Sequence, residues 1–202
     1  MTSHPAGPVA AAILAGGQAR RLGGANKAAL SIGGVRIIDR QLALLRQLAD
    51  PVFIVSGHPG RFDDLALEVV RDALPGRGAL GAVYTALLTS PHPRALILAC
   101  DMPFVTLSFL ERLVQPSTAD LVIPRSSRGY EPLCATWTSA CIPAVRRRLD
   151  RGELQAARAV EDLRVEEIGP EALARWDPHG RLFVNVNTPP DYERAIRLAD
   201  HA

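Results

Sequence analysis

A segment near the start of the chain combines glycines with positive charge in a pattern suited to binding phosphate. It runs from Leu14 to Lys27 and reads LAGGQARRLGGANK. Glycines leave little side chain between backbone N–H groups and a ligand, and such amides can cradle an anion. Arg20, Arg21 and Lys27 add three positive charges. We therefore expect this segment to bind the phosphates of a nucleotide, although a flexible surface loop would have a similar composition.

Lys27 is the only lysine among 23 basic residues. Lysine carries a compact charge on a flexible stem, whereas arginine presents a planar fork. A lysine among glycines is typical of a site that binds a phosphate close to the backbone. Alternatively, a genomic bias toward arginine could have left one lysine by chance. The segment lacks the spacing of GxxxxGK[ST] and of GxGxxG, so it is neither a P-loop nor a standard dinucleotide site.

Asp101 follows the apolar run ALILAC and precedes Met102 and Pro103. A carboxylate at the exit of a buried strand is costly unless it is paired or bound to a cation. At the carboxyl edge of a sheet it would be well placed to hold Mg²⁺. The alternative is an aspartate that only caps the next turn.

Two further polar groups follow short apolar runs. Asp72 comes shortly before Gly76 and Gly78, where it could contact a base or ribose or simply form a turn. Asn185 and Asn187 alternate in FVNVNTP, so they point to one face of an extended segment. They could complete a metal shell or bind phosphate, while Asn187 and its neighbour could equally cap the last helix.

Strand and helix patterns alternate along the chain and would position these residues. Short apolar runs predict strands at 9–14, 52–55, 67–70, 95–99, 121–123 and 133–137. Helical spacing occurs around 38–49, 80–88, 140–150 and after 188, and Ser108 with Glu111 suits a capping box for one more helix. This alternation predicts a mostly parallel sheet covered by helices, in a single domain over residues 1–202. Ligands bind such sheets at the carboxyl ends of the strands.

The composition is that of an ordinary soluble protein, with a formal net charge of +2 and 22% charged residues. We expect no nucleic-acid partner and interpret the three arginines at 146–148 as a solvated helix face. No apolar run approaches the roughly 20 residues of a membrane span. The three cysteines form no CxxC pair and the histidines no ligand pair, which favours reduced thiols, no structural zinc and a cytoplasmic location.

Taken together, these segments resemble the molybdenum cofactor guanylyltransferase family. The resemblance lies in LAGG-x3-RLGG-x2-K at 14–27, GALGA at 78–82, CDMP at 100–103 and FVNVNTP at 183–189. It implies a Rossmann-like nucleotidyltransferase fold, a three-layer α/β/α sandwich. It also implies transfer of GMP from GTP to the terminal phosphate of molybdenum–molybdopterin, with release of pyrophosphate. Transient contact with molybdoenzymes or cofactor-insertion proteins would follow.

The resemblance also implies roles for individual residues. Asp101 would bind the nucleotide together with Mg²⁺, and Asn185 and Asn187 would line the metal or molybdopterin end. Arg21 and Lys27 would neutralise charge on the pyrophosphate, and no catalytic base is needed because the attacking phosphate is already ionised. The other expected nucleotide contacts are Leu14, Ala15, Gly16, Gly17, Lys27, Val55, Asp72 and Gly78.

Two departures and several alternatives accompany this interpretation. Asn26 stands where the family commonly has Asp, and Ala79 where it usually has Pro. A cytidylyltransferase for the same cofactor would typically read LAAG, so Gly16 favours a purine. A nucleotidyltransferase for sugar phosphates is a more distant alternative. A catalytically idle nucleotide-binding partner of a molybdoenzyme is another, against which Lys27 and Asp101 argue.

Overall fold

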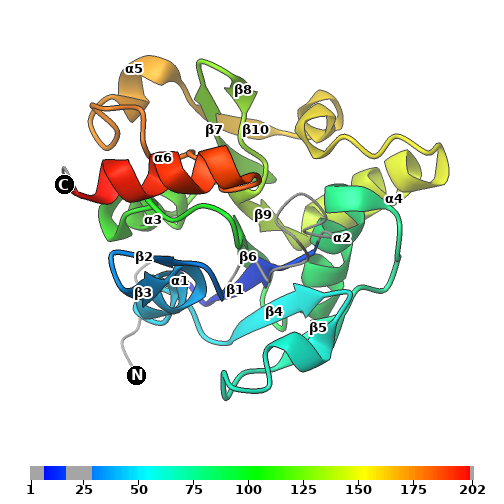
Figure 1. Cartoon of the computed structure of the whole chain (residues 1–202). Coiled ribbons are helices and arrows are strands. Elements are labelled where there is room, and N and C mark those ends of the chain that lie inside the picture. The colour runs from blue at the N-terminus through cyan, green and yellow to red at the C-terminus, as the bar shows by residue number, and fades with distance from the viewer. Residues whose placement is uncertain (1–6, 17–28, 201–202) are drawn as a thin grey trace.

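The computed structural model describes residues 7–16 and 29–200, which form a central β-sheet flanked by helices (Figure 1). Within these residues, eight strands make one sheet, and β2 (Ser31–Ile32) and β3 (Val35–Arg36) form a separate hairpin. The main sheet has the order β10-β7-β9-β6-β1-β4-β5, with β8 paired to β7. Its strands are β1 (Val9–Leu14), β4 (Val52–Ser56), β5 (Val69–Arg71), β6 (Arg94–Ala99), β7 (Leu121–Ser126), β8 (Gly129–Tyr130), β9 (Cys134–Thr138) and β10 (Val165–Ile168).

Five of the six α-helices among the described residues lie in regions where the sequence predicts a helix, and α5 was not predicted. The α-helices are α1 (Ile37–Leu45), α2 (Gly78–Thr89), α3 (Leu107–Leu113), α4 (Ile142–Asp150), α5 (Pro170–Leu173) and α6 (Pro189–Asp200). Short 3-10 turns lie at η3 (Pro59–Arg61), η4 (Ser139–Cys141) and η5 (Ala156–Asp162). No helix in the described part of the chain is both long and apolar enough to cross a membrane.

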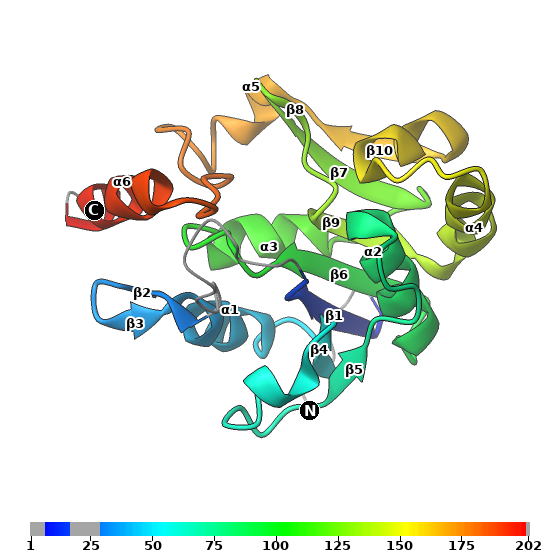
Figure 2. The same ribbon diagram turned by 45° about the vertical axis from the view of Figure 1, so that its right-hand side comes forward.

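β1 lies at the centre of the sheet and pairs in parallel with β4 and β6. It is buried along its whole length, which explains its continuous apolar sequence. Alternate residues of β1 face two different cores. Ile13 packs with α1 and α3 on one face, whereas Leu14 packs with α2 and α4 on the other. The three layers of the predicted sandwich are therefore present, with α2 beside α4 and away from α1 (Figure 2).

The sheet is mixed rather than wholly parallel. β9 runs antiparallel to both β6 and β7, whereas β1, β4, β5 and β6 form a parallel block and β10 pairs in parallel with β7. Pairing Leu14 with Val55 and with Ala99 brings the carboxyl ends of three parallel strands to one edge. This is the edge at which the sequence places the candidate site.

A small third core connects segments that are distant in sequence. Ile32, Ile37, Val186 and Ala195 are buried together, and Phe104 and Tyr192 pack against them. The hydroxyl of Tyr192 on α6 also donates a hydrogen bond to the carbonyl oxygen of Ser31, at 2.6 Å. This core therefore joins the β2–β3 hairpin and α6 to the segment that carries the two asparagines.

Some local predictions are wrong. α3 begins two residues earlier than predicted, because the hydroxyl of Thr106 accepts from the N–H of Phe109 and so replaces Ser108 as the N-cap. Leu88, predicted on the buried stripe of α2, is 54% exposed. The segment FVNVNTP, expected to be extended, contains no strand. In contrast, α6 begins at Pro189 after Thr188, as predicted.

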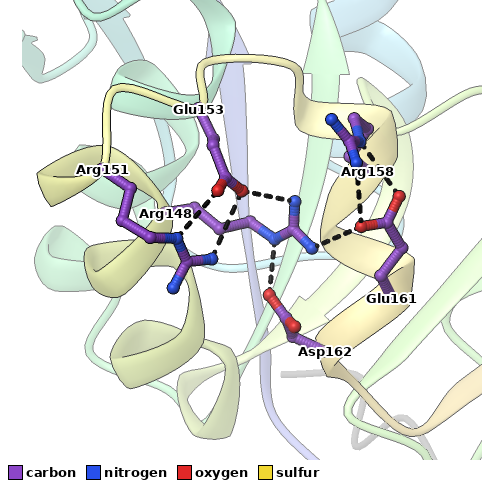
Figure 3. Close-up of polar contacts among 6 residues, drawn as sticks. All are labelled: Arg148, Arg151, Glu153, Arg158, Glu161 and Asp162. Carbon is purple, nitrogen blue, oxygen red and sulfur yellow. Dashed lines mark hydrogen bonds and ion pairs between the residues drawn. The ribbon is translucent and has the colours of Figure 1, made fainter.

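The predicted solvated face at 146–148 is wrong for Arg148, whose side chain is 3% exposed. Its guanidinium donates to Asp162 at 2.5 Å, to Glu161 at 2.9 Å and to Glu153 at 3.0 Å (Figure 3). A buried charge must be paired, and these three carboxylates meet that requirement. The network ties the segment after α4 to the helix, and Leu154 in this segment lies next to Gly78 at the start of α2.

Candidate active site

A cavity of about 620 Å³ opens at the carboxyl edge of the parallel strands. Its size lies within the usual range for small-molecule sites, roughly 300–1,000 Å³. Most of the residues that line it lie at the ends of β1 and β6, in the segments after β1, β4, β5 and β6, or near the start of α2, and two others precede β9 and α6. The lining residues are Leu14, Gly16, Gly57, His58, Asp72, Pro75, Gly76, Gly78, Ala79, Ala82, Ala99, Cys100, Asp101, Met102, Leu133 and Asn185.

The cavity brings together residues from each of the segments singled out in the sequence. Six expected contacts line it: Leu14, Gly16, Asp72, Gly78, Asp101 and Asn185. Their roles in binding remain predictions, but their shared location meets the geometric requirement for one site. Gly17, Arg21 and Lys27 lie outside the described residues.

Three expected contacts do not line the cavity. Val55 is 1% exposed and belongs to the sheet, and its carbonyl oxygen accepts from the N–H of Ala15 at 2.9 Å. Ala15 packs against the core instead. Asn187 lies beside the start of α6, where its backbone N–H donates to Asp191.

Asp101 lies in the turn that follows β6. The N–H of Cys100 donates to the carbonyl oxygen of Leu14 at 3.1 Å, which joins this turn to the start of the glycine-rich segment. The N–H of Val186 donates to the carbonyl oxygen of Asp101 at 2.9 Å. Main-chain hydrogen bonds thus hold three segments of the predicted site together around Asp101.

Asp72 has a structural role in addition to lining the cavity. Its Oδ1 accepts from the N–H of Leu74 and from the hydroxyl of Thr85, each at 3.0 Å. The first bond, from the N–H two residues further on, closes an Asx turn. The second fixes the turn to α2, because Thr85 is buried in that helix. Asp72 therefore forms a turn that places its carboxylate at the cavity wall, and its contact with a nucleotide stays a prediction.

The start of α2 forms another part of the wall. Gly78 has φ +62°, a conformation that residues with a Cβ seldom adopt. Its own Cβ position would lie 3.9 Å from the side chain of Leu154. The first N–H groups of a helix have no partner within the helix and favour an anion nearby. The N-terminus of α2 therefore gives this cavity wall a positive electrostatic character.

Asn185 connects this cavity to a second one of about 420 Å³. The second cavity lies between the β7–β8 turn, the region after α5 and the start of α6. Its polar lining comprises Ser126, Ser127, Arg128, Asp177, Asn185, Asp191 and Arg194. Arg128 also donates to the carbonyl oxygen of Phe183, which anchors the asparagine segment to the β7–β8 turn.

α6 has a capped N-terminus next to this second cavity. Asp191 Oδ2 accepts from the N–H and the hydroxyl of Thr188, each at 2.8 Å. The Thr188 hydroxyl, together with backbone N–H groups of Asn187 and Thr188, holds the pKa of Asp191 below its usual value. The hydroxyl of Thr188 in turn accepts from the N–H of Asp191 at 3.3 Å, so the capping alternative is confirmed for Thr188. The backbone N–H of Asn187 also donates to Asp191.

Asp101 and Asn185 offer a carboxylate and an amide suited to Mg²⁺, and Asn185 lines both cavities. Asp101 lines the larger cavity, and the buried Oδ1 of Asn185 has no hydrogen-bond partner among the described residues. No cluster of three His, Cys, Asp or Glu in the described ranges could hold a metal by itself. Mg²⁺ commonly takes one or two carboxylates and completes its shell with water and substrate phosphates. The donors present therefore fit a metal that binds together with a nucleotide.

Sequence reasoning missed two residues of this region. His58 lines the larger cavity just after β4, in a position that no motif marked. Gln41 is buried on α1 and donates to main-chain oxygens on either side of Asp101. Its position on the apolar face of a predicted helix was the available signal, because polar residues rarely occur there without a partner.

The family model for the MobA-like NTP transferase domain matches residues 11–167 of the chain. The chain belongs to the MobA-like NTP transferase family. The match extends from β1 into β10, so it covers the strands around the larger cavity. The asparagine segment and α6 lie beyond it.

Individual relatives of this MobA-like NTP transferase extend the similarity to nearly the whole chain. A molybdenum cofactor guanylyltransferase from Desulfosudis oleivorans is 32% identical over 91% of this chain and 92% of its own length. A probable molybdenum cofactor guanylyltransferase from Chloroflexus aggregans is 35% identical, with 89% of each chain covered. The crystal structure of molybdopterin-guanine dinucleotide biosynthesis protein A from Archaeoglobus fulgidus has a TM-score of 0.79 and 25% identity, covering 96% of this chain and all of the other.

Proposed function

We propose that the protein transfers GMP from GTP to the terminal phosphate of molybdenum–molybdopterin and releases pyrophosphate. The observation that carries this proposal is the junction of two cavities at Asn185, beside the turn that bears Asp101. A transferase that joins two substrates needs two adjoining sites whose reacting groups meet. The similarity to molybdenum cofactor guanylyltransferases supports the choice of substrates.

In this proposal the larger cavity binds GTP and the smaller one binds the acceptor. The glycine-rich segment begins at the cavity wall after Leu14, so its backbone amides would face the phosphates. Lys27 and Arg21 would neutralise the leaving pyrophosphate. In the acceptor cavity, Arg128 and Arg194 offer positive charge to a phosphorylated ligand. No residue needs to act as a base, because the acceptor phosphate is already ionised.

Magnesium belongs to the same proposal. Asp101 and Asn185 would hold Mg²⁺ against the nucleotide, where it would draw charge from the reacting phosphate oxygens. We also propose a cytoplasmic location, and transient contact with molybdoenzymes or cofactor-insertion proteins that receive the product.

A preference for guanine rests on Gly16. This residue lines the larger cavity, and a Cβ added to it would meet no atom of the described residues within 4 Å. A side chain there would therefore project into open space beside the ligand, and its absence leaves that space for a purine. Gly16→Ala should weaken GTP binding more than CTP binding.

The deciding experiment measures pyrophosphate release with molybdenum–molybdopterin and GTP, CTP or ATP in turn, with and without Mg²⁺. We expect release that needs GTP, acceptor and Mg²⁺ together. Faster turnover with CTP would identify a cytidylyltransferase for the same acceptor. GTP binding without turnover would identify an idle nucleotide-binding protein.

A further inference from the structure

Gln41 is a buried polar side chain on the otherwise apolar inner face of α1. It is 1% exposed and lies between Ile37, Ile38, Leu42 and Leu45, which are also buried. Placing an amide at such a position costs free energy unless its polar atoms are paired. We therefore expect the buried amide of Gln41 to form specific hydrogen bonds.

The interaction is a pair of hydrogen bonds from Nε2 of Gln41. One goes to the carbonyl oxygen of Ala99 at 2.8 Å, and the other to that of Met102 at 3.1 Å. Ala99 is the last residue of β6, and Met102 directly follows Asp101. The amide therefore bridges the two sides of the turn that carries Asp101.

The orientation of this amide is fixed by its surroundings. Oε1 of Gln41 is buried with no hydrogen-bond partner in the part of the chain that the structure describes. The opposite orientation would set this oxygen against two carbonyl oxygens, which repel it. The two hydrogen bonds that Nε2 donates thus outweigh the cost of leaving Oε1 unpaired. This indicates that a hydrogen-bond donor is needed at residue 41.

We propose that Gln41 is a positioning residue that fixes the Asp101 carboxylate in the nucleotide cavity. This inference rests on the proposed function, in which Asp101 binds GTP together with the metal. Main-chain bonds from Cys100 and Val186 also tie this turn to its neighbours. Gln41 adds a side-chain tie from a different helix. Without it, two carbonyl oxygens lose their donor and the turn relaxes, which moves Asp101 relative to the ligand.

The test substitutes Gln41→Met, which keeps a similar side-chain length and removes both donors. The probe is Mn²⁺ in the presence of GTP, with bound metal followed by electron paramagnetic resonance. We expect metal affinity to fall about 10-fold to 100-fold, as is usual when the group that orients a ligand is lost. Amide hydrogen exchange at residues 99–103 should become faster in the variant without any ligand.

Two control variants separate positioning from general loss of stability. Gln47→Met changes an exposed glutamine that donates to the carbonyl oxygen of Ala43 at 2.8 Å, just after the same helix. Ile38→Val removes a methyl group from the buried face of α1. Both controls should bind Mn²⁺ with GTP as the wild type does, and neither should change exchange at residues 99–103.

A measurement on the wild type removes any dependence on folding of the variant. The side-chain NH₂ signals of Gln41 should shift when Mg²⁺ is added to the GTP complex, because the bridged turn responds to metal binding. Equal metal affinity and equal exchange in Gln41→Met, or unchanged NH₂ signals, would overturn the positioning role. A wild type that binds no Mn²⁺ with GTP would instead refute the proposed function.

Discussion

The backbone N–H of Val186 donates a hydrogen bond to the carbonyl oxygen of Asp101, at 2.9 Å. This bond joins the asparagine segment to the turn after β6, two features that lie far apart in the sequence. Because Asn185 precedes Val186, the same contact brings the Asn185 amide to the cavity that Asp101 lines. This main-chain contact thus links the two segments that carry the carboxylate and the amide proposed to bind Mg²⁺.

Asp101→Asn should nearly abolish transfer while leaving the protein folded. Removing a buried charge seldom harms stability when its cation is also lost. GTP should still bind through the glycine-rich segment. Pyrophosphate release across a Mg²⁺ titration, with thermal unfolding in parallel, checks this prediction. Asp63→Asn, at an exposed carboxylate, is the control and should behave as wild type. If Asp101→Asn kept the wild-type Mg²⁺ profile, Asp72 would be the next candidate.

Lys27→Ala should lower kcat on the order of 10²-fold, as is typical when a group that stabilises transition-state charge is lost. Lys27→Arg should also impair the enzyme, because a planar fork does not replace a compact charge among glycines. Steady-state kinetics with GTP and the acceptor provide the measurement. Full activity of Lys27→Arg would show that the sole lysine is an accident of composition.

Arg148→Met should lower the melting temperature by roughly 5 °C, since three carboxylates lose a shared partner (Figure 3). The carboxylates are partly exposed and can turn toward water, which limits the loss. Arg147→Met, at the exposed neighbouring position, should change it far less. Thermal unfolding of both variants tests this, and equal melting temperatures would mean that the network contributes nothing to stability.

Asp191→Asn should destabilise the protein at neutral pH, because the carboxylate accepts three hydrogen bonds at the start of α6. The Thr188 hydroxyl, with the neighbouring backbone, lowers the pKa of Asp191 in the folded state. Its stabilising effect is therefore complete above the ordinary value of 3.8 and is lost as the pH falls through the lower folded value. Unfolding of both proteins between pH 7 and pH 3 should show their difference shrinking at the acid end. The exposed variant Glu193→Gln is the control, and a constant difference would contradict the assignment.

The central strands could be predicted because burial on both faces leaves a continuous apolar signal. Residues 9–14 were predicted as a strand, and β1 has those bounds. The start of α3 was mispredicted because Thr106 and Ser108 both carry a suitable hydroxyl, and local sequence does not decide between them. The burial of Arg148 was missed because its partners look like ordinary surface charges until the segment after α4 folds back.

The candidate site shows the same limits. Asp101 was recognisable as a polar residue at the end of an apolar run, and strand order alone brings it beside Leu14. Val55 stays a predicted nucleotide contact, and its side chain packs in the core, so a contact there would have to come from the backbone. The sequence did not indicate that His58 lines the cavity, because its position there depends on the path of the loop after β4.

β9 runs antiparallel to β6 and β7, and it separates the parallel block of the sheet from the β7–β8 hairpin. The sequences of these two parts could therefore vary independently. Because Cys134 pairs with Leu98, the hairpin before β9 arrives at the same edge as the nucleotide cavity without belonging to the parallel block. Ser126 and Arg128 of that hairpin line only the smaller cavity. If the smaller cavity binds the acceptor, as we propose, insertions or exchanges in this hairpin would alter the choice of acceptor and leave the nucleotide cavity intact. The hairpin would then be the place to graft a new acceptor specificity.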